Sequence, residues 1–376
     1  MRLLENECYL QDLRSVSDLA LPWEKLQGKS FLISGATGMI GSTLIQVLMD
    51  RNDRHGLGCS VTALGRNEEK GHERLGEYWG RDDFTFVRCD INDMENLRGA
   101  AREAAALSDG GKASFHYIFH AASNTHPVAY ANDPIGTVVT NIIGLNNLLD
   151  LAADLGAERF LFASSNEIYG ENRGDIERFD EKYCGYIDCN TLRAGYTESK
   201  RAGEALCQAY IRQKGLDVVI PRFTRSFGPT LLKTDTKALS QFIAKGVAGE
   251  DIVLKSAGTQ YFSYTYVMDA VSGLLTCLTK GVCGEAYNIA DESCDIRLKD
   301  LAGIIADYTG RKVVFEIPDE VETAGYSKAT KALLDSSKLQ ALGWKAQFPI
   351  GTALEHTIDI LRAVSRTDDR NGQDSF

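Results

Sequence analysis

One glycine-rich loop near the N-terminus limits the folds open to this chain more than any other feature. A short apolar run at residues 30–34 leads straight into the sequence GATGMIG, and a helical pattern follows over residues 42–50. Glycines at such a turn let the backbone approach a pyrophosphate, while the helix N-terminus supplies N–H donors and partial positive charge. The strand-loop-helix context therefore predicts a dinucleotide-binding loop. The loop residues expected to bind the cofactor are Gly35, Thr37, Gly38, Met39, Ile40 and Gly41.

Strand and helix patterns alternate along the first two thirds of the chain. Further buried strands are expected at residues 60–64, 85–88, 116–120, 159–163 and 217–220, with helical stretches such as 135–155 and 197–214 between them. This alternation predicts an α/β fold with a Rossmann doubly wound parallel sheet. Beyond residue 222 the alternation loosens, which indicates a smaller C-terminal α/β domain that binds the substrate.

The expected domain organisation follows from these patterns. The predicted segments are an N-terminal helical arm at 1–28, a dinucleotide-binding domain at 29–224 to which 266–292 return, a substrate-binding domain at 225–265 and 293–363, and a polar disordered tail at 364–376. Within them we expect a hairpin-like region at 252–266, and we expect Asp269 to cap the helix that follows it.

Composition and charge exclude several classes of function. A formal net charge of −11 disfavours a nucleic-acid surface, which needs a basic stripe. The nine cysteines form no C-x-x-C pair and the six histidines show no ligand spacing with them, so we expect reduced thiols and no metal. The N-terminus carries early acids, and no uninterrupted apolar run approaches the ~18 residues of a membrane span. A cytoplasmic protein with no membrane partner is the expectation.

Four further motifs give the chain its family resemblance. They are Asp90-Ile91 after the third strand, His120-Ala121-Ala122 after the fourth, an Asn-x-x-Gly-x-x-Asn helix read as Asn141, Gly144 and Asn146, and the pair Tyr196-x-x-x-Lys200. With GATGMIG, they make the chain similar to the extended short-chain dehydrogenase/reductase family. The resemblance implies that Asp90 and Ile91 contact the adenine, that Ala121 and Ala122 line the cofactor, and that two chains pair as a homodimer through the helices at 135–155 and 197–214.

The candidate catalytic pair lies on one helix. Tyr196 and Lys200 are one turn apart, so both side chains project from the same face. A phenol is a poor base at neutral pH, but an adjacent ammonium and a positive nicotinamide ring favour its phenolate. By resemblance, Ser165 hydrogen-bonds the substrate oxygen at C4 while Tyr196 removes its proton. The alternative for Ser165 is that it caps the next helix.

Glu167 and Asn166 bear on which reaction follows C4 oxidation. A 4-keto group acidifies C5, and the resemblance places a glutamate at the position of Glu167 in 4,6-dehydratases and hexuronate decarboxylases. Asn166 stands where some dehydratases carry an aspartic acid that protonates the leaving C6 oxygen, which an amide does not readily do. Glu167 therefore favours chemistry at C5, and Asn166 favours decarboxylation over dehydration. The alternative is that Glu167 is a loop carboxylate with a salt partner.

The substrate segments depart from the family pattern at two places. The segment 222–229 resembles the family's Arg-x-x-Asn-x-Tyr-Gly-Pro, with Arg225 in place of the asparagine, and Ser226 follows it. The segment 258–264 matches one whose arginine grips the diphosphate or a sugar acid, and Phe262 stands in its place. The exchange suggests that the cation has moved to Arg225. The alternative is a less anionic substrate.

The end of the second strand bears on cofactor choice. Family members that use NAD usually place an acid there for the ribose hydroxyls, but this chain has Gly65-Arg66-Asn67. Arg66 adds a cation for a 2′-phosphate, which favours NADP over NAD; the alternative is that Arg66 is a solvated loop cation and NAD binds without the acid.

The predicted function is a nucleotide-sugar enzyme that keeps its nicotinamide cofactor. The best single prediction is an enzyme like UDP-glucuronate decarboxylase. A 4,6-dehydratase and a 4-epimerase are the next alternatives, and an NADPH-dependent carbonyl reductase is the alternative from another class.

Overall fold

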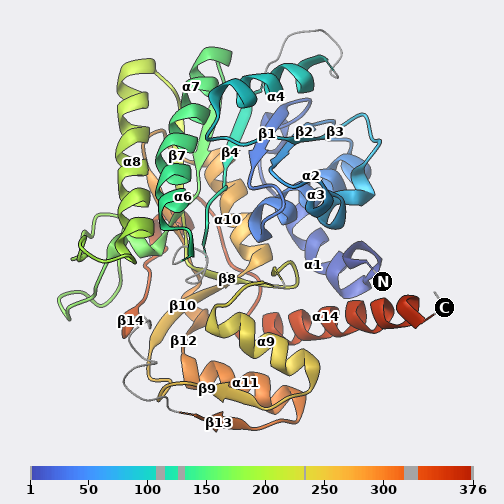
Figure 1. Ribbon diagram of the computed structural model, residues 1–376, viewed down its shortest axis with the longest axis vertical. Coiled ribbons are helices and arrows are strands. Elements are labelled where there is room, and N and C mark those ends of the chain that lie inside the picture. The colour runs from blue at the N-terminus through green and yellow to red at the C-terminus, as the bar shows by residue number, and fades with distance from the viewer. Residues whose placement is uncertain (1, 107–114, 126–131, 233, 317–328, 374–376) are drawn as a thin grey trace.

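The computed structural model describes residues 2–106, 115–125, 132–232, 234–316 and 329–373. Its centre is a parallel sheet with strand order β3-β2-β1-β4-β5-β7-β11, and the short β6 pairs with β7 (Figure 1). This confirms the predicted doubly wound sheet. Its strands are β1 (Ser30–Ser34), β2 (Ser60–Gly65), β3 (Phe84–Arg88), β4 (Tyr117–His120), β5 (Arg159–Phe162), β6 (Ser164–Ser165), β7 (Val218–Phe223) and β11 (Ala286–Ile289).

Alternate side chains of each strand enter different helical layers. In β1, Phe31 and Ile33 belong to one buried cluster and Leu32 to the other, as the period of two in a strand requires. The layer on the Leu32 side contains α4 (Met94–Ala106), α7 (Leu145–Leu155) and α8 (Ala194–Lys214), and the other layer contains α2 (Met39–His55) and α10 (Val267–Lys280). Since β1 pairs with β2 on one side and with β4 on the other, the carboxyl ends of β1 and β4 mark the topological switch point, where ligands bind in sheets of this type.

The predicted helix 135–155 is interrupted by a wider turn. It consists of α6 (Pro134–Val139), a π-helical turn at Thr140–Gly144, and α7. The whole run, Pro134–Leu155, is long and apolar enough to cross a membrane by length and composition alone, but half of its most apolar window is buried inside the protein. Burial of that kind is typical of a core helix of a sheet protein, which passes the same test.

The N-terminal residues form an arm that packs on the sheet domain. It consists of a 3₁₀ turn at Leu3–Glu5, α1 (Glu7–Ser17) and a second turn at Trp23–Lys25. Tyr9, Leu13 and Val16 are buried at one face of α1, and α1 contacts α2, α10 and α14.

The rest of the chain forms two smaller sheets with their own helices. One has the order β12-β10-β14 with β8 also paired to β10, and the other pairs β13 with β9. The strands are β8 (Arg225–Phe227), β9 (Ile252–Leu254), β10 (Tyr261–Tyr266), β12 (Asp295–Arg297), β13 (Val313–Phe315) and β14 (Lys331–Ala332), and the helices are α9 (Ala238–Ala248), α11 (Leu298–Thr309), α13 (Ser337–Gln340) and α14 (Ile350–Gln373). The short helix α3 (Glu68–Leu75) follows β2 and contacts β3, and its Leu75 belongs to the same buried cluster as α2 and α10.

Three local expectations need revision. Residues 252–266 are not a hairpin, because β9 and β10 pair with different partners in different sheets. Asp269 does not cap α10: Tyr266 holds the cap position, and the Asp269 carboxylate accepts from the backbone N–H groups of Gln347 and Phe348 at 2.8 and 3.1 Å. Helix α14 runs on to Gln373, through residues 364–373 of the segment expected to be disordered, because each residue added to a formed helix gains a backbone hydrogen bond.

The domain boundaries stay predictions, although the topology places their segments. Residues 266–292, expected to return to the dinucleotide domain, supply α10 and the sheet strand β11. Residues 317–328 of the expected substrate domain and 374–376 of the expected tail lie outside the described residues.

Candidate active site

The glycine-rich loop is shaped by close backbone contacts. Gly35 has φ +72°, and a Cβ built on it would lie 2.6 Å from the backbone of Ala121. A Cβ on Gly41 would lie 2.4 Å from the Gly35 carbonyl oxygen. Only glycine fits at either position. The missing side chains allow β1, β4 and the start of α2 to approach one another closely at this loop.

The start of α2 is suited to an anion. Gly38 is its N-cap and provides no side-chain cap, and the first turn holds no acid. The N–H groups at this end are therefore available to a phosphate, with the helix dipole in its favour. Thr37, Met39 and Ile40 are half-buried around them. This uncapped terminus and the space that the glycines leave fit a dinucleotide pyrophosphate.

Arg66 lies at the neighbouring strand end, as the sequence places it. It is exposed directly after β2, beside Gly65. A Cβ on Gly65 would lie 2.8 Å from the Phe86 ring and 3.8 Å from the Thr37 methyl group, so β2 ends against the glycine-rich loop. The next residue, Asn67, caps α3. Within the described residues, no acid occupies the strand end.

The expected adenine and nicotinamide contacts follow β3 and β4 at the same sheet edge. Asp90 is exposed with its Oδ1 accepting from the Asn92 N–H, and Ile91 is buried. Ala121 and Ala122 are half-buried beside the loop.

The Asn-x-x-Gly-x-x-Asn reading is corrected by one residue. Asn147, not Asn146, completes the spacing, and its Nδ2 donates to the Ile91 carbonyl oxygen at 2.9 Å. Gly144 is required there, since a Cβ would lie 2.9 Å from the Ile91 side chain. Asn141, in the π-helical turn, donates to Ser199 Oγ at 2.9 Å and so ties α6 and α7 to α8.

Tyr196 and Lys200 lie on the buried face of α8, with 8% and 2% of their surfaces exposed. The Lys200 ammonium donates to the Ala163 carbonyl oxygen at 2.8 Å and lies 4.8 Å from the centre of the Phe162 ring. Burial lowers the pKa of Lys200 to about 8. The ammonium is thus held at the carbonyl oxygen of Ala163, two residues before Ser165 in the chain. It is charged at neutral pH, and its pKa lies only a little higher.

His120 is the last residue of β4 and is fully buried. Its Nδ1 is 2.7 Å from Ser34 Oγ, and its Nε2 has no hydrogen-bond partner among the described residues. Burial, and then the charge of Lys200, holds the pKa of His120 well below its usual range. Because the imidazole of His120 is neutral, Lys200 carries the positive charge in this part of the site.

Ser165, Asn166 and Glu167 share one short turn. Ser165 ends β6 and its Oγ accepts from the Glu167 N–H at 3.2 Å, so it does cap the 3₁₀ turn Asn166–Tyr169, as the alternative reading proposed. Such a cap occupies one lone pair and leaves the hydroxyl proton for a substrate oxygen. Asn166 is buried, and α8 packs against both β6 and the turn. The serine and the carboxylate are therefore presented from one rigid element beside Tyr196 and Lys200.

A buried ion pair fixes this turn from behind. Glu204 on α8 accepts from Ser164 Oγ at 2.5 Å and binds the Arg222 guanidinium through both oxygens, at 2.9 and 2.6 Å. Arg222 also donates to the Tyr169 hydroxyl at 2.9 Å. The neighbouring residues of Ser165 and the end of the turn are thus clamped to α8 and β7.

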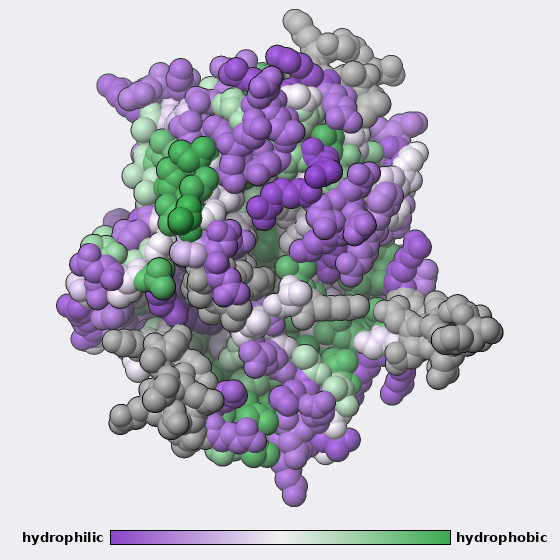
Figure 2. Space-filling model, viewed as in Figure 1, coloured by the Kyte–Doolittle hydropathy of each residue, from purple (hydrophilic) through white to green (hydrophobic). Residues whose placement is uncertain are grey.

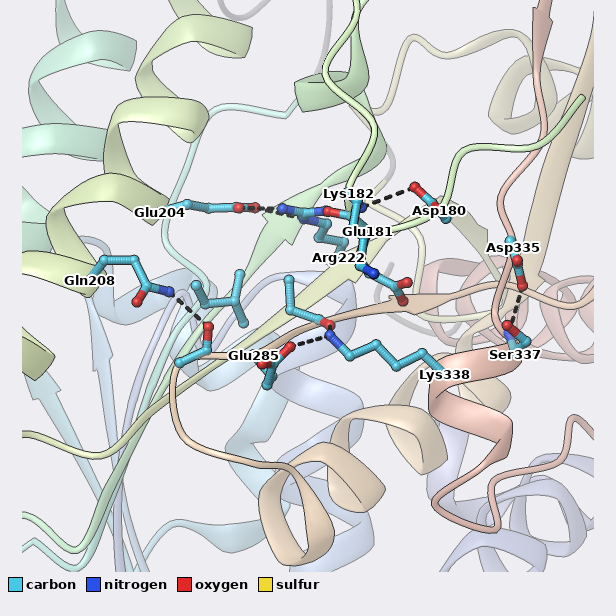
Figure 3. Close-up of a pocket in the computed structure, with 13 residues that line it drawn as sticks. Asp180, Glu181, Lys182, Glu204, Gln208, Arg222, Glu285, Asp335, Ser337 and Lys338 are labelled. Atoms are coloured by element: carbon cyan, nitrogen blue, oxygen red, sulfur yellow. Dashed lines mark hydrogen bonds and ion pairs between the residues drawn. The ribbon is translucent and has the colours of Figure 1, made fainter. Parts of the chain in front are cut away.

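The cavity beside this pair is a separate feature. It has a volume of about 530 Å³ and lies among α8, β7, β11 and α13 (Figure 3). Its charged lining is paired internally, as in Arg222 with Glu204 and Lys338 with Glu285. None of Ser165, Glu167, Tyr196 and Lys200 lines it, so it has no part in the chemistry inferred for them.

Arg225 and Phe262 are neighbours across the small sheet. Arg225 in β8 is paired in register with Tyr264 of β10, and its guanidinium lies 3.7 Å from the centre of the Phe262 ring. The Phe262 side chain, 8% exposed, is a platform beneath the cation. The two departures from the family pattern are therefore one physical unit, and Ser226 follows Arg225 in the same strand with its Oγ donating weakly to Thr224.

Glu167 faces two arginines. Arg193 is 3.4 Å from Glu167 Oε2, and Arg225 is 4.0 Å from Oε1. Sequence reasoning missed Arg193, although its place three residues before Tyr196 puts it one turn away on the same helix face. Glu167 therefore does have salt partners, as the alternative interpretation expected. The same contacts put two cations beside the carboxylate that is predicted to act at C5.

Comparisons with known proteins agree with this geometry. The family model described as the NAD dependent epimerase/dehydratase family matches residues 31–290. UDP-glucuronic acid decarboxylase 1 of Xenopus tropicalis is 30% identical over 335 residues, 89% of this chain and 72% of that protein. UDP-glucuronic acid decarboxylase 6 of Arabidopsis thaliana is 30% identical over 323 residues, 86% of each chain.

Solved structures share the fold. A UDP-glucose 4-epimerase from Thermotoga maritima, solved with UDP-glucose, has a TM-score of 0.73 at 22% identity and covers 89% of this chain and 99% of its own. A dTDP-glucose 4,6-dehydratase from Streptomyces venezuelae, solved with NAD, has a TM-score of 0.72 at 24% identity, with 89% and 97% covered. The matched region includes the glycine-rich loop, Ser165, Tyr196 and Lys200, and the chain belongs to the NAD-dependent epimerase/dehydratase family of enzymes, the extended short-chain dehydrogenases/reductases.

Proposed function

We propose that this enzyme oxidises a nucleotide-diphosphate sugar at C4 and then acts at C5, as a decarboxylase of the UDP-glucuronate type. The observation that carries the proposal is the short turn in which the Oγ of Ser165, the proposed C4 contact, accepts a hydrogen bond from the backbone N–H of Glu167. One element therefore carries both this hydroxyl and the Glu167 carboxylate. The two relatives at 30% identity are UDP-glucuronic acid decarboxylases, which supports the same reaction.

The residues divide the work at C4. Ser165 hydrogen-bonds the C4 oxygen, and Tyr196 takes its proton while the ammonium of Lys200, one helical turn away, stabilises the phenolate. A bound nicotinamide cofactor would supply reversible hydride acceptance at C4. The glycine-rich loop and the start of α2 would hold its pyrophosphate.

The 4-keto group makes the next step possible. A glucuronyl 4-ketone is a β-keto acid, so the C5–C6 bond breaks, CO₂ leaves, and the bonding electron pair becomes a C4–C5 enolate. The enolate then takes a proton at C5, and reduction restores the C4 hydroxyl. Glu167 is placed to deliver that C5 proton, and Arg193 and Arg225 are placed to receive the sugar carboxylate before it is lost.

Asn166 separates the decarboxylase from the dehydratase. Loss of water needs an acid to protonate the C6 oxygen as it leaves, and the buried Asn166 amide stands where that acid is expected. A 4-epimerase needs no group at C5. The two arginines beside Glu167 favour an acidic sugar, and the carboxylate of Glu167 favours chemistry at C5 over epimerisation at C4.

The decisive experiment incubates the enzyme with a panel of nucleotide sugars and follows the product mass. Loss of CO₂ from a uronate supports the proposal, loss of water identifies a dehydratase, and isomerisation without mass change identifies an epimerase. Turnover only with added NADPH and a carbonyl substrate would identify a reductase and overturn the nucleotide-sugar assignment.

A Glu167→Gln variant tests the C5 role. Transient nicotinamide reduction should persist because Ser165, Tyr196 and Lys200 are intact, while product formation and solvent deuterium uptake at C5 should fall about a hundredfold to ten-thousandfold. Glu171→Gln, whose carboxylate pairs with Arg173 outside the site, is the matched control. Unchanged product formation in Glu167→Gln would reduce Glu167 to a structural residue.

We propose further that the cofactor is NADP rather than NAD. The support is the exposed Arg66 directly after β2, where members of the family that use NAD usually place an acid for the ribose hydroxyls.

We propose also that two chains pair through α6, α7 and α8. Figure 2 shows a hydrophobic patch over α6 on the molecular surface. Ile135 is 77% exposed, and Ile143 and Val138 are 46% and 37% exposed. The run Pro134–Leu155 buries half of its most apolar stretch inside the protein but still exposes these three side chains. This exposed apolar surface is suited to packing against a partner helix.

A further inference from the structure

A cluster of metal-ligating side chains joins the two ends of the chain, away from the residues that carry the chemistry. Cys8 and Asp12 lie one turn apart on α1, and His356 lies on α14. Their candidate ligand atoms all lie within 4.8 Å of one another. Figure 1 shows α1 and α14 side by side near both termini, and the two helices are in contact. Sequence spacing gave no sign of the cluster because 344 residues separate Asp12 from His356.

We propose that Cys8, Asp12 and His356 bind a divalent transition metal ion of the zinc type. The ligand set of one thiolate, one carboxylate and one imidazole is the mixed set that Zn²⁺ accepts in tetrahedral sites. A thiolate and a carboxylate would together balance the two positive charges of the ion. Cys8 and His356 are both half-buried, so a water molecule could reach the cluster and complete the coordination of an ion held there.

The carboxylate is oriented as a ligand by a further shell. Asp12 is 3% exposed, and its Oδ2 accepts from the Tyr266 hydroxyl at 2.7 Å. Tyr266 is fully buried in the core, so it fixes the direction of the carboxylate in the way that outer partners fix metal ligands. Without an ion, His356 Nδ1 lies 3.0 Å from Asp12 Oδ1. A bound ion would replace this hydrogen bond between His356 and Asp12. It would also bind the Cys8 thiolate, which takes no part in the hydrogen bond.

Such an ion would fasten the N-terminal arm to the last helix. Metal binding to the folded arrangement and not to the separated ends stabilises the fold by mass action. The site is distinct from the proposed sugar chemistry, so its failure would leave the proposed function untouched.

The experiment titrates the full-length, chelator-treated protein with Zn²⁺ against a chromophoric competitor. Wild type should bind one Zn²⁺ per chain, and Cys8→Ser and His356→Gln should each weaken binding at least about tenfold. Cys283→Ser and His55→Gln, which change an exposed cysteine and histidine elsewhere, should bind as wild type does. Wild-type binding no tighter than that of Cys8→Ser would overturn the proposal.

Cobalt provides a readout that does not depend on stability. Co²⁺ bound by a thiolate gives a sulfur-to-metal charge-transfer absorption, which should appear in wild type and in Cys283→Ser and vanish in Cys8→Ser. Cys8→Ser keeps the hydrogen bond between Asp12 and His356, so the variant should fold. Absence of the band in wild type would contradict a cysteine ligand.

Discussion

Lys200 shows how a single residue balances burial against charge. Its ammonium is almost fully enclosed, with one carbonyl oxygen and one aromatic ring as its described partners. Burial removes hydration that these partners only partly replace, and the pKa falls to about 8. The protein therefore gives up stability at this position to keep a cation one helical turn from Tyr196, the proposed catalytic base.

The lowered pKa of Lys200 predicts that the free energy of unfolding depends on pH. Between pH 8 and 10.5 the unfolded chain keeps a proton on this lysine that the folded chain has released, so the wild type gains stability as pH rises through this window. Lys200→Met should be more stable than wild type at pH 7 by an amount on the order of 2 kcal/mol that shrinks toward pH 10. Urea unfolding of both proteins at each pH measures the difference. A constant difference would show that Lys200 is not buried as described.

Arg66 carries the cofactor prediction at the same scale. Arg66→Ala should weaken NADP binding by about tenfold, the worth of one charge-assisted hydrogen bond, and leave NAD binding nearly unchanged. Isothermal titration with both cofactors measures this, with Arg102→Ala on α4 as an exposed control. An equal loss for both cofactors would contradict a phosphate contact.

Single residues were predictable where chemistry demands a residue type at a fixed spacing. Tyr196 with Lys200 and the glycines of the loop were found this way. Arg193, Glu204 and His356 were not, because their roles depend on partners that only folding brings near. Asp269 was misassigned for the same reason, since the backbone N–H groups that donate to its carboxylate lie 78 and 79 residues further along the chain.

Among the elements, the glycine-rich loop offers the sharpest test. Gly35 and Gly28 share a positive φ, +72° and +68°, but only at Gly35 would a Cβ meet backbone, whereas nothing lies within 4 Å at Gly28. Gly28→Ala should cost about 1 kcal/mol of unfolding free energy through its backbone conformation alone. Gly35→Ala should cost several times more and abolish cofactor binding, as measured by denaturant midpoints and cofactor titration. Equal costs would mean that the close approach of β1 and β4 is not enforced.

The strand-helix alternation was visible in the sequence because buried parallel strands are short apolar runs between amphipathic helices. The small sheets were harder to predict. β9 and β10 are close in sequence but pair with strands supplied by later segments, so no local pattern separates them from a hairpin. The π-helical turn is likewise invisible, since its residues continue the helical periodicity.

For the whole molecule, the exposed face of α6 and the π turn predicts assembly. Replacing both Ile135 and Ile143 by Asp should convert a dimer to monomers, because two charges would be buried without partners. Sedimentation velocity measures the change, and Val282→Asp, 57% exposed at a distant turn, is the control. A wild type that sediments as a monomer would contradict the pairing.

The meeting of Asp12, Tyr266 and His356 has a consequence for synthesis on the ribosome. Asp12 is translated early, but His356 follows 344 residues later, which at typical elongation rates takes roughly twenty seconds to a minute. In the last part of that interval the Asp12 carboxylate can already meet Tyr266 but not yet His356. Chains that stall before α14 therefore leave the face of α1 that contacts this helix uncovered.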